Sequence, residues 1–390
     1  MTPVRDILAK LIAFDTTSRH SNLALMHYIE SLLAEVGIVS TLIPDSTGTK
    51  ANLYATVGPQ DRGGVMLSGH TDVVPVDGQH WTVPAFTLTE SDNRYYGRGT
   101  TDMKGFVACA VSAALNASQQ TLKTPLHLGL SYDEEIGCVG VHSLIELLQQ
   151  APVKPALCIV GEPTSLSVAT KHKGKMSVLA RCYGKAGHSA LAPNAFNAIH
   201  LACDLVAILR TTQDVLRDAC TETNLDAVPY TTVHVGRIHT DQALNIVPSL
   251  CEVYFEIRHT ANDDPQAILN NIQQHCQPLI DVAKQQATEA AIEFDVWNAY
   301  PGLDTPANAN VVSFVQSLLD EDTTTTTTTS VAFGTEAGLF SEHVGIPTVV
   351  CGPGSMDQGH KPDEFVSIDQ IKRCESMMNR LIQRLASTAL

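Results

Sequence analysis

The sequence predicts an α/β fold in which a mostly parallel sheet, with helices on both faces, is interrupted by a small inserted α+β domain. Short apolar runs alternate with helical patterns in the first and last parts of the chain, as in a largely parallel sheet. The stretch between them changes to strand-like alternation of apolar and polar residues. The length of 390 residues also exceeds the usual range for one domain, about 50–250 residues.

The first and last parts of the chain supply the elements of the predicted parallel sheet. Apolar runs indicate buried strands at Gly64–Ser68, Leu126–Ser131, Ala156–Val160, Ser330–Phe333 and Pro347–Cys351. Helical patterns occur at Met1–Phe14, Leu23–Val36, Met103–Ala117, Val139–Gln149 and Asp369–Ala386. We therefore expect one domain made of residues 1–174 and 299–390.

The middle of the chain, residues 175–298, predicts a different architecture. Strands are expected at Lys175–Tyr183, Thr231–Ile238, Leu250–His259 and Ala291–Trp297, and helices at Asn194–Leu209 and Asp264–Gln286. The order β-α-β-β-α-β is that of a ferredoxin-like unit. After it, the seven threonines Thr323–Thr329 are read as a loop running into the strand at Ser330, because Thr favours extended chain.

Composition excludes several classes of protein. Hydrophobic residues make up 44% and charged residues 17%, as in an ordinary globular protein. A net charge of −16 argues against nucleic-acid binding, which needs clustered Lys and Arg. The N-terminal segment lacks the long apolar run of a signal or a membrane span, so we expect a cytoplasmic protein that does not bind membranes. Ten cysteines without a C-x-x-C pair indicate buried free thiols.

Polar residues that could carry chemistry follow the predicted strands. His70 comes just after the first strand, and Asp72 follows it at the spacing of a carboxylate that orients a metal-binding imidazole. A structural histidine would give the same pattern. Asp102 lies in a Gly-rich turn before a helix, where an N-cap is the alternative.

Two more predicted strands end in acidic residues, and the last is followed by a histidine. Glu134 and Glu135 lie in a run of three acids, which is typical of a solvated loop or of a metal cluster that compensates the repulsion. Glu162 and His360 follow later strands. Because parallel strands of an open α/β sheet place their ligands at the carboxyl ends, these side chains should converge. Mixed N/O ligation suits zinc, cobalt or manganese.

The motifs together resemble one known family. They are HTDVVPV, GRGTTDMKG, DEEIG, GEPT, GHSALAPNAFNAI, ALNIVP, FEIR, FGTEAG and GPGSMDQGHKPDEF. In order and spacing, from His70 to Phe365, they resemble the M20 family of metallopeptidases and deacylases. Within it, VGEPT with HKG, the PYTT run, FGTEAG and VVCGPG are most similar to the acetylornithine deacetylase branch.

The resemblance implies a centre of two divalent metal ions, with zinc expected and cobalt or manganese as alternatives. One ion would be held by His70 and Glu162, the other by His360 and Glu135, and Asp102 would bridge them. Asp72 would orient His70, and Glu134 would act as general base and acid. The family pattern also implies a cis peptide bond between Asp102 and Met103.

The resemblance assigns three further residues, all in the inserted domain. His188 would stabilise the oxyanion in the partner subunit's site, so the inserted domain would act as a lid and hold together a homodimer. Asn245 and Arg258 would contact the substrate's backbone or carboxylate. Arg258 suits carboxylate binding, although a strand-end Arg is also a common surface ion-pair partner.

The expected activity is hydrolysis of the amide of a small N-acyl amino acid, with N2-acetyl-L-ornithine as the expected substrate and a place in arginine biosynthesis. Another M20 activity, such as that of a succinyl-diaminopimelate desuccinylase or a dipeptidase, would use the same metal set. A non-catalytic binding module on this fold is the remaining alternative, but it would have no reason to retain Glu134 beside intact ligands.

Overall fold

The computed structural model describes residues 3–221, 228–319 and 328–388. The chain divides into two compact units, each described by itself. Unit 1 consists of Met1–Lys171, Leu303–Val331 and Thr335–Leu390. Unit 2 consists of His172–Gly302 and Ala332–Gly334.

Unit 1 is built on a sheet whose four central strands are parallel, in the order β6-β3-β7-β17. These strands are β3 (Val65–His70), β6 (Leu126–Ser131), β7 (Leu157–Pro163) and β17 (Thr348–Gly352). Every residue in them is buried, which explains why they are largely apolar. The predicted α/β fold with a mostly parallel central sheet is confirmed.

Further strands extend this sheet at both ends. On one side β1 (Ser40–Pro44) and β2 (Ala51–Val57) continue the sheet in antiparallel pairing. On the other side lie β8 (Ala169–His172), β15 (Leu303–Asp304) and β16 (Thr329–Val331). The part of the threonine run from Thr323 to Thr327 lies outside the described residues, and Thr329 already belongs to β16.

Helices cover both faces of the unit 1 sheet. On one face α3 (Lys104–Ala117) lies so close that a Cβ added at Gly161 would overlap the ring of Phe106. A Cβ at Gly129 would instead contact Leu144 of α4 (His142–Gln150) and Met66. Because Met66 points away from the α3 face, the two helices lie on opposite faces.

Three longer helices and three short helical elements complete the described part of the unit. Helices α1 (Val4–Ala13), α2 (Leu23–Glu35) and α9 (Ile368–Ser387) pack around α3 in the main hydrophobic core. The others are α7 (Asn310–Gln316), α8 (Ala337–Leu339) and the π-helical turn η2 (Phe340–Val344). Among the described residues no helix is both long and apolar enough to span a membrane.

A small antiparallel sheet joins two distant segments of unit 1. Its strands are β4 (Thr89–Ser91), β5 (Arg94–Tyr96) and β18 (Phe365–Ser367), with Phe365 opposite Tyr96. It therefore brings the chain just before Asp102 beside the chain just after His360. The sequence did not predict these strands, since they are three residues long and partly polar.

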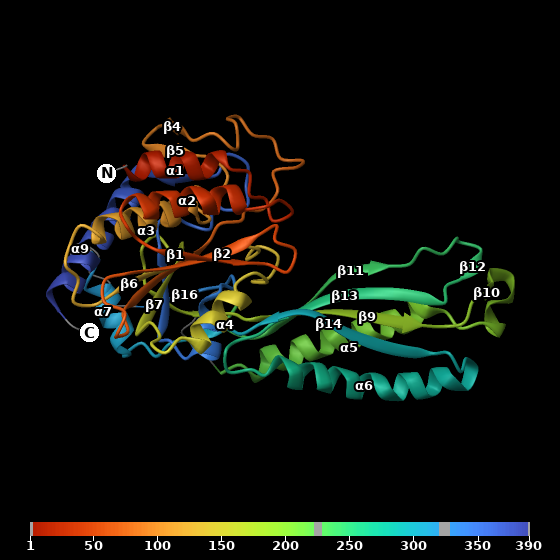
Figure 1. Ribbon diagram of the computed structural model, residues 1–390. Helices are drawn as coiled ribbons and strands as arrows, with labels where there is room; N and C mark the ends of the chain where they lie inside the picture. Colours follow the sequence, from red (N-terminus) through yellow and green to blue (C-terminus); the bar gives the residue numbers. More distant parts are fainter. Residues whose placement is uncertain (1–2, 222–227, 320–327, 389–390) are drawn as a thin grey trace. The chain divides into compact units, whose positions relative to one another are not determined.

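Unit 2 is a four-stranded antiparallel sheet with two helices, in the order β11-β13-β9-β14. The strands are β9 (Lys175–Tyr183), β11 (Thr232–His239), β13 (Leu250–Arg258) and β14 (Ala291–Tyr300). Helices α5 (Ala198–Ala219) and α6 (Pro265–Gln286) lie side by side along the sheet (Figure 1). This is the predicted ferredoxin-like order.

One predicted helix of unit 2 is wrong at both ends. The 3-10 helix η1 (Ser189–Asn194) occupies the predicted start, and α5 begins only after Asn197, whose side chain accepts a hydrogen bond from the N–H of Ile199. The helix then continues to Ala219 rather than ending at Leu209. Its last turns are largely solvent-exposed, so they carry no apolar periodicity that the sequence could reveal.

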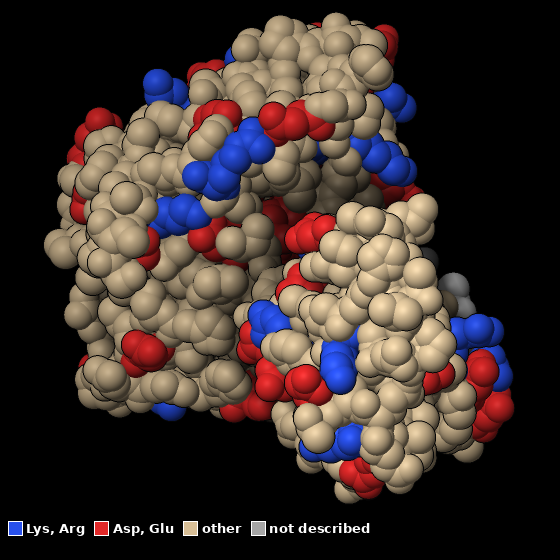
Figure 2. All heavy atoms as spheres, turned by 90° about the vertical axis from the view of Figure 1, so that its right-hand side faces the viewer, with Lys and Arg blue, Asp and Glu red and all other residues tan. Residues whose placement is uncertain are grey.

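Charged side chains of both signs are mixed on the surface shown in Figure 2, and most of the thiols are buried. On the face shown in Figure 2, Lys and Arg side chains are scattered among Asp and Glu and do not form a continuous basic patch. The ten cysteines are free and eight of them are buried, as predicted.

Candidate metal centre

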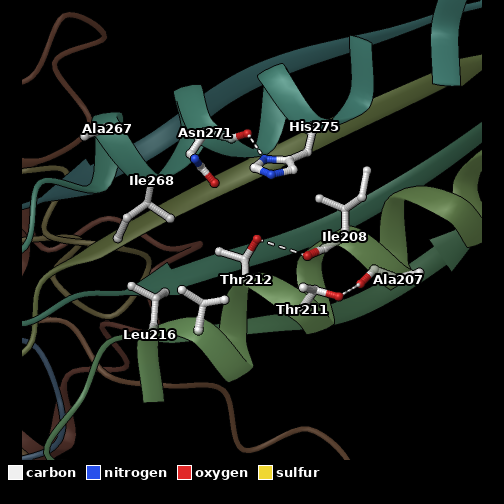
Figure 3. A pocket seen from close by; sticks show the side chains of 10 residues that line it. Ala207, Ile208, Thr211, Thr212, Leu216, Ala267, Ile268, Asn271 and His275 are labelled. Carbon is white, nitrogen blue, oxygen red and sulfur yellow. Dashed lines mark hydrogen bonds between the residues drawn. The ribbon is translucent and has the colours of Figure 1, made fainter. Parts of the chain in front are cut away.

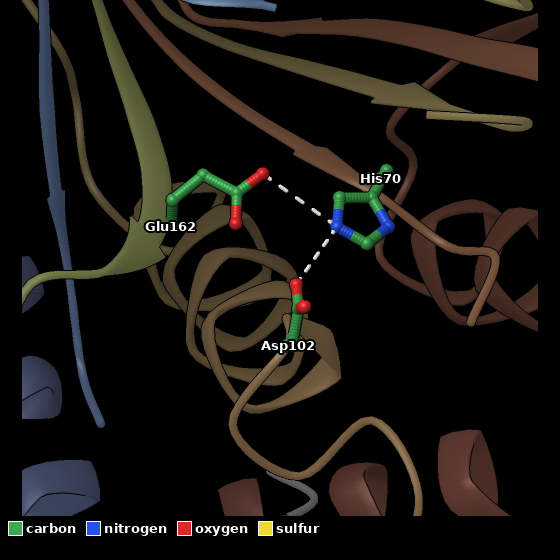
Figure 4. A group of neighbouring side chains, drawn as sticks. All are labelled: His70, Asp102 and Glu162. Atoms are coloured by element: carbon green, nitrogen blue, oxygen red, sulfur yellow. Dashed lines mark hydrogen bonds and ion pairs between the residues drawn. The ribbon is translucent and has the colours of Figure 1, made fainter. Parts of the chain in front are cut away.

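The first group of candidate ligands lies where the central strands of unit 1 end. His70 is the last residue of β3, and Glu162 is the penultimate residue of the neighbouring β7. Nε2 of His70 is 3.1 Å from Oδ1 of Asp102 and 3.6 Å from Oε1 of Glu162 (Figure 4). All three side chains are buried.

The second group shares Asp102 with the first. Nε2 of His360 is 3.1 Å from Oδ2 of Asp102 and 3.0 Å from Oε2 of Glu135. In each group the candidate ligand atoms lie within 4.8 Å of one another. Asp102 thus turns one oxygen to each group, and the five predicted ligand residues are brought together in the arrangement expected of a bridged pair of ions.

The electrostatics of the two groups fit bound cations. Burial, followed by the charge of Asp102, raises the pKa of Glu135 to about 7. Hydrogen bonds to Asp102 and Glu135 raise the pKa of His360 to about 10. In addition, Oε1 of Glu135 is buried and has no hydrogen-bond partner among the described residues. A divalent ion would relieve the crowding of carboxylates and give this oxygen a partner.

Asp102 is not the N-cap of the following helix. Helix α3 begins at Lys104 with Met103 in the cap position and no side-chain cap. The carboxylate of Asp102 instead points to the two histidines, and their hydrogen bonds lower its pKa although burial opposes this. The peptide bond between Asp102 and Met103 is cis, as the family resemblance implied.

Glu134 lies beside the ligand groups but belongs to neither. Burial, together with the charge of Glu135, raises its pKa well above the usual value, even though His70 opposes the shift. The thiol of Cys138 donates a hydrogen bond to Oε1 of Glu134 over 3.4 Å. A carboxyl group held near, but outside, a ligand set has the position that a general base requires.

Asp72 lies against His70, as expected, and also makes contacts that the sequence did not predict. Nδ1 of His70 lies 3.0 Å from the backbone carbonyl of Asp72 and 3.5 Å from its carboxylate. The carboxylate accepts hydrogen bonds from the backbone N–H groups of Glu134 and Glu135 and from the hydroxyl of Ser18. Asp72 therefore holds the backbone of the acidic pair as well as lying next to His70.

The three remaining predicted site residues lie in unit 2. His188, in β10 (Gly187–His188), is exposed and pairs with Ile246 of β12 (Ile246–Val247). Asn245 precedes β12, and its carbonyl accepts from the N–H of Ser189 over 2.9 Å, so His188 and Asn245 are neighbours.

Arg258 lies at the end of β13, apart from the β10–β12 pair. Its Nε is 3.1 Å from Oε1 of Glu256, and its Nη1 donates to the hydroxyl of Tyr300 over 3.2 Å. An ion pair, which the sequence left open as the alternative role of Arg258, is therefore present.

Three buried residues near the centre received no role from the sequence. Glu336 of FGTEAG is buried, and burial raises its pKa to about 7. Arg98 and Glu364, from GRG and PDEF, form a buried ion pair of 2.6 Å. All three residues are charged residues inside the motifs found in the sequence. The local sequence, however, does not show which charged side chains are buried.

A separate hollow lies between α5 and α6 of unit 2, with a volume of about 730 Å³ (Figure 3). Apolar side chains such as Ile208, Leu216 and Ile268 line it, together with Thr211, Asn271 and His275. His275 is engaged with the backbone carbonyl of Asn271, over 2.8 Å. The hollow contains neither of the two ligand groups found in the described residues.

Comparisons with known proteins were made for the whole chain. The model of peptidase family M20/M25/M40 matches residues 66–384. Acetylornithine deacetylase of Pasteurella multocida is 33% identical over 363 residues, covering 93% of this chain and 91% of that protein. The acetylornithine deacetylase of Klebsiella pneumoniae is 32% identical over 390 residues, covering 98% and 97%.

Solved structures of lower identity share the fold. The M20 family metallo-carboxypeptidase Sso-CP2 from Sulfolobus solfataricus has a TM-score of 0.78 at 18% identity, covering 100% of both chains. The Bacillus subtilis YXEP protein, a dinuclear metal-binding peptidase of the M20 family, has a TM-score of 0.71 at 14% identity, covering 99% of this chain and 98% of its own.

Proposed function

The chain belongs to peptidase family M20/M25/M40, and from this premise we propose that it deacetylates N2-acetyl-L-ornithine, releasing L-ornithine and acetate as a step of arginine biosynthesis. The observation that carries the proposal is similarity to acetylornithine deacetylases over nearly the whole chain, at 33% identity. The two groups of candidate ligand residues support it.

The candidate metal centre would hold two divalent ions. His70 and Glu162 would bind one, His360 and Glu135 the other, and Asp102 would bridge them. Zinc is the expected metal, and cobalt or manganese also suit nitrogen and oxygen ligands. Ions bound there would lower the pKa of a water molecule from about 15.7 toward 7, which supplies a nucleophile at neutral pH.

Glu134 would transfer the proton in both halves of the reaction. Its carboxylate takes a proton from water as the oxygen attacks the acyl carbon, and it later gives this proton to the departing amine nitrogen. The raised pKa of Glu134 supports this role, because a carboxylate with a raised pKa is a stronger base toward water.

Residues of unit 2 would complete the site from a second subunit. We propose a homodimer formed through residues 175–298, in which His188 stabilises the developing oxyanion in the partner's site. Asn245, the neighbour of His188, would contact the substrate backbone. Arg258 would bind the substrate carboxylate, for which it must exchange its contact with Glu256.

The alternatives within the family differ in substrate only. A desuccinylase or a dipeptidase would use the same ligand groups, and several proteins of the same fold are peptidases. Identity above 30% to acetylornithine deacetylases favours the deacetylase.

A substrate panel tests the proposal. The protein should release acetate from N2-acetylornithine faster than it hydrolyses N-succinyl-diaminopimelate or any dipeptide tested at the same concentration. The matched control is Glu134→Gln, which should bind substrate but hydrolyse it slower by a factor of about 10²–10⁴ or more. Faster cleavage of a succinyl substrate or dipeptide would reassign the activity, and binding without hydrolysis of any substrate would favour a non-catalytic module.

A further inference from the structure

A single buried carboxylate, that of Glu364, collects four hydrogen-bond donors close to the candidate metal centre. Its Oε2 accepts from Nη1 of Arg98 over 2.6 Å and from the N–H of Gly99 over 3.1 Å. Its Oε1 accepts from the N–H groups of Thr101 and Asp102, over 2.9 and 3.1 Å. The fourth donor is therefore the backbone of the residue that bridges the two ligand groups.

The partner of Glu364 reaches toward the other loop of the centre. Arg98 donates from Nη1 to the carbonyl of Lys361 over 3.4 Å and from Nη2 to Oε1 of Gln79 over 2.6 Å. Gln79 in turn donates from Nε2 to the carbonyl of His360 over 3.1 Å. The ion pair is thus linked to the backbone that carries His360 as well as to the backbone that carries Asp102.

Stability alone does not account for this pair. Arg98 and Glu364 are each only 1% exposed. Removing two charges from water is costly, and a buried ion pair is often no more stabilising than apolar residues of the same volume. Neither residue is in a ligand group. Their hydrogen bonds instead fix the two loop segments that carry Asp102 and His360, whose side chains must meet to form one ligand group.

We propose that Glu364, held by Arg98, is a positioning residue that sets the affinity of the Asp102, Glu135 and His360 group for its ion. The proposal rests on the proposed two-metal function. His70 and Glu162 project from β3 and β7, strands of the buried sheet, whereas Asp102 and His360 project from loops. The group of Asp102, Glu135 and His360, here called loop-borne, therefore takes both Asp102 and His360 from loops. The strand-borne group of His70, Asp102 and Glu162 takes only Asp102 from one, so it should depend less on Glu364.

Calorimetric titration of the metal-free protein with Zn²⁺ tests this. Glu364→Gln retains one acceptor oxygen but turns an NH₂ group toward N–H donors, so it disturbs the loop without changing side-chain size. We expect one of the two binding steps to weaken by about 10–100-fold, the usual effect of losing a partner that orients ligands. His360→Ala, which removes a ligand of the loop-borne group alone, identifies the affected step.

The matched control is Glu90→Gln, in β4 of the same small sheet. Glu90 pairs with Arg5 at an exposed position, and no hydrogen bond or ion pair among the described residues joins its side chain to either loop, so both binding steps should keep their wild-type affinities. A second test variant, Arg98→Lys, keeps the buried charge but loses the planar guanidinium that contacts Glu364, Gln79 and Lys361 at once. Arg98→Lys should weaken the same metal-binding step as Glu364→Gln, but by a smaller factor.

Three outcomes would overturn the proposal. They are wild-type affinities in Glu364→Gln, equal weakening of both steps, and selective weakening of the step that His70→Ala removes. If Glu364→Gln does not fold, the same outcomes in Arg98→Lys decide. A wild-type protein that binds fewer than two ions would contradict the proposed function itself, whereas two ions in the wild type with unchanged variants would contradict this inference alone.

Discussion

The carboxylate of Asp72 accepts a hydrogen bond from the backbone N–H of Glu134, with 3.1 Å between Oδ1 and the nitrogen. Its second oxygen accepts from the N–H of Glu135 over 3.2 Å. One buried side chain at the end of β3 thus fixes the backbone from which both the proposed base and a proposed ligand project. Replacing Asp72 should therefore affect the site more than replacing a residue that contacts only His70.

Asp72→Asn should therefore impair both chemistry and metal binding. The amide keeps one acceptor oxygen, so one of the two backbone N–H groups loses its partner. We expect metal affinity to fall by about 10–100-fold, measured by titration of the metal-free variant. Ser18→Ala is the control, since it removes only the hydroxyl that donates to Asp72. Equal affinities in Asp72→Asn and wild type would show that Asp72 does not position the pair.

Elemental analysis of protein purified without chelator should find close to two equivalents of transition metal per chain, because five ligand residues form two groups around Asp102. Treatment with a chelator should abolish hydrolysis, and added Zn²⁺ or Co²⁺ should restore it. Metal-free protein with full activity would be incompatible with a two-metal mechanism.

Glu134 and Glu135 should respond differently to the same substitution. Glu134→Gln should keep both ions but lose a factor of about 10²–10⁴ or more in kcat, the usual contribution of general acid–base catalysis. Glu135→Gln should instead weaken metal binding, since Oε2 of Glu135 lies in the His360 group. Steady-state rates and metal content of the two variants provide the measurement. The reverse pattern would exchange the two roles.

Mixing two inactive variants should restore activity if His188 acts across a dimer. In a mixed dimer of His188→Ala and Glu134→Ala, one site has both residues intact and the other has neither. Random exchange of equal amounts makes half the dimers mixed, so about a quarter of wild-type activity should return. Mass spectrometry of differently labelled chains must first show that exchange occurs. Confirmed exchange without recovery would place His188 in its own chain's site or outside catalysis.

The acid stability of unit 1 should depend on His127, whose pKa burial lowers from 6.5 to about 4. Between these values the unfolded chain binds a proton that the folded protein does not, so the free energy of unfolding should fall as pH falls through this window. The slope from one such group is at most about 1.4 kcal/mol per pH unit.

His127→Gln should make the free energy of unfolding less dependent on pH between about 6.5 and 4. Denaturant titrations of wild type and variant at several pH values provide the comparison. His343→Gln, at an exposed position, controls for the loss of a histidine as such. Parallel pH profiles for wild type and His127→Gln would show that this histidine does not contribute.

The central sheet and the meeting of the five candidate ligand residues could be predicted because burial leaves local traces in the sequence. A fully buried strand is largely apolar, and a charged or metal-binding residue at its end, such as His70 or Glu162, then stands out. The contacts of Asp72 and Glu364 could not be predicted. They join residues 62 and 262 positions apart, Asp72 to Glu134 and Asp102 to Glu364, and only the folded backbone brings them together.

The pairing of β17 with β7 also governs the order in which a newly made chain can fold. A ribosome releases β3, β6 and β7 first, then the whole of unit 2, and only then β17 and His360. Unit 2 is nearly continuous in sequence and can complete its core as it emerges, whereas β7 must wait for a partner from the far end of the chain. During that interval β7 presents an unpaired apolar edge, the kind of surface that chaperones cover.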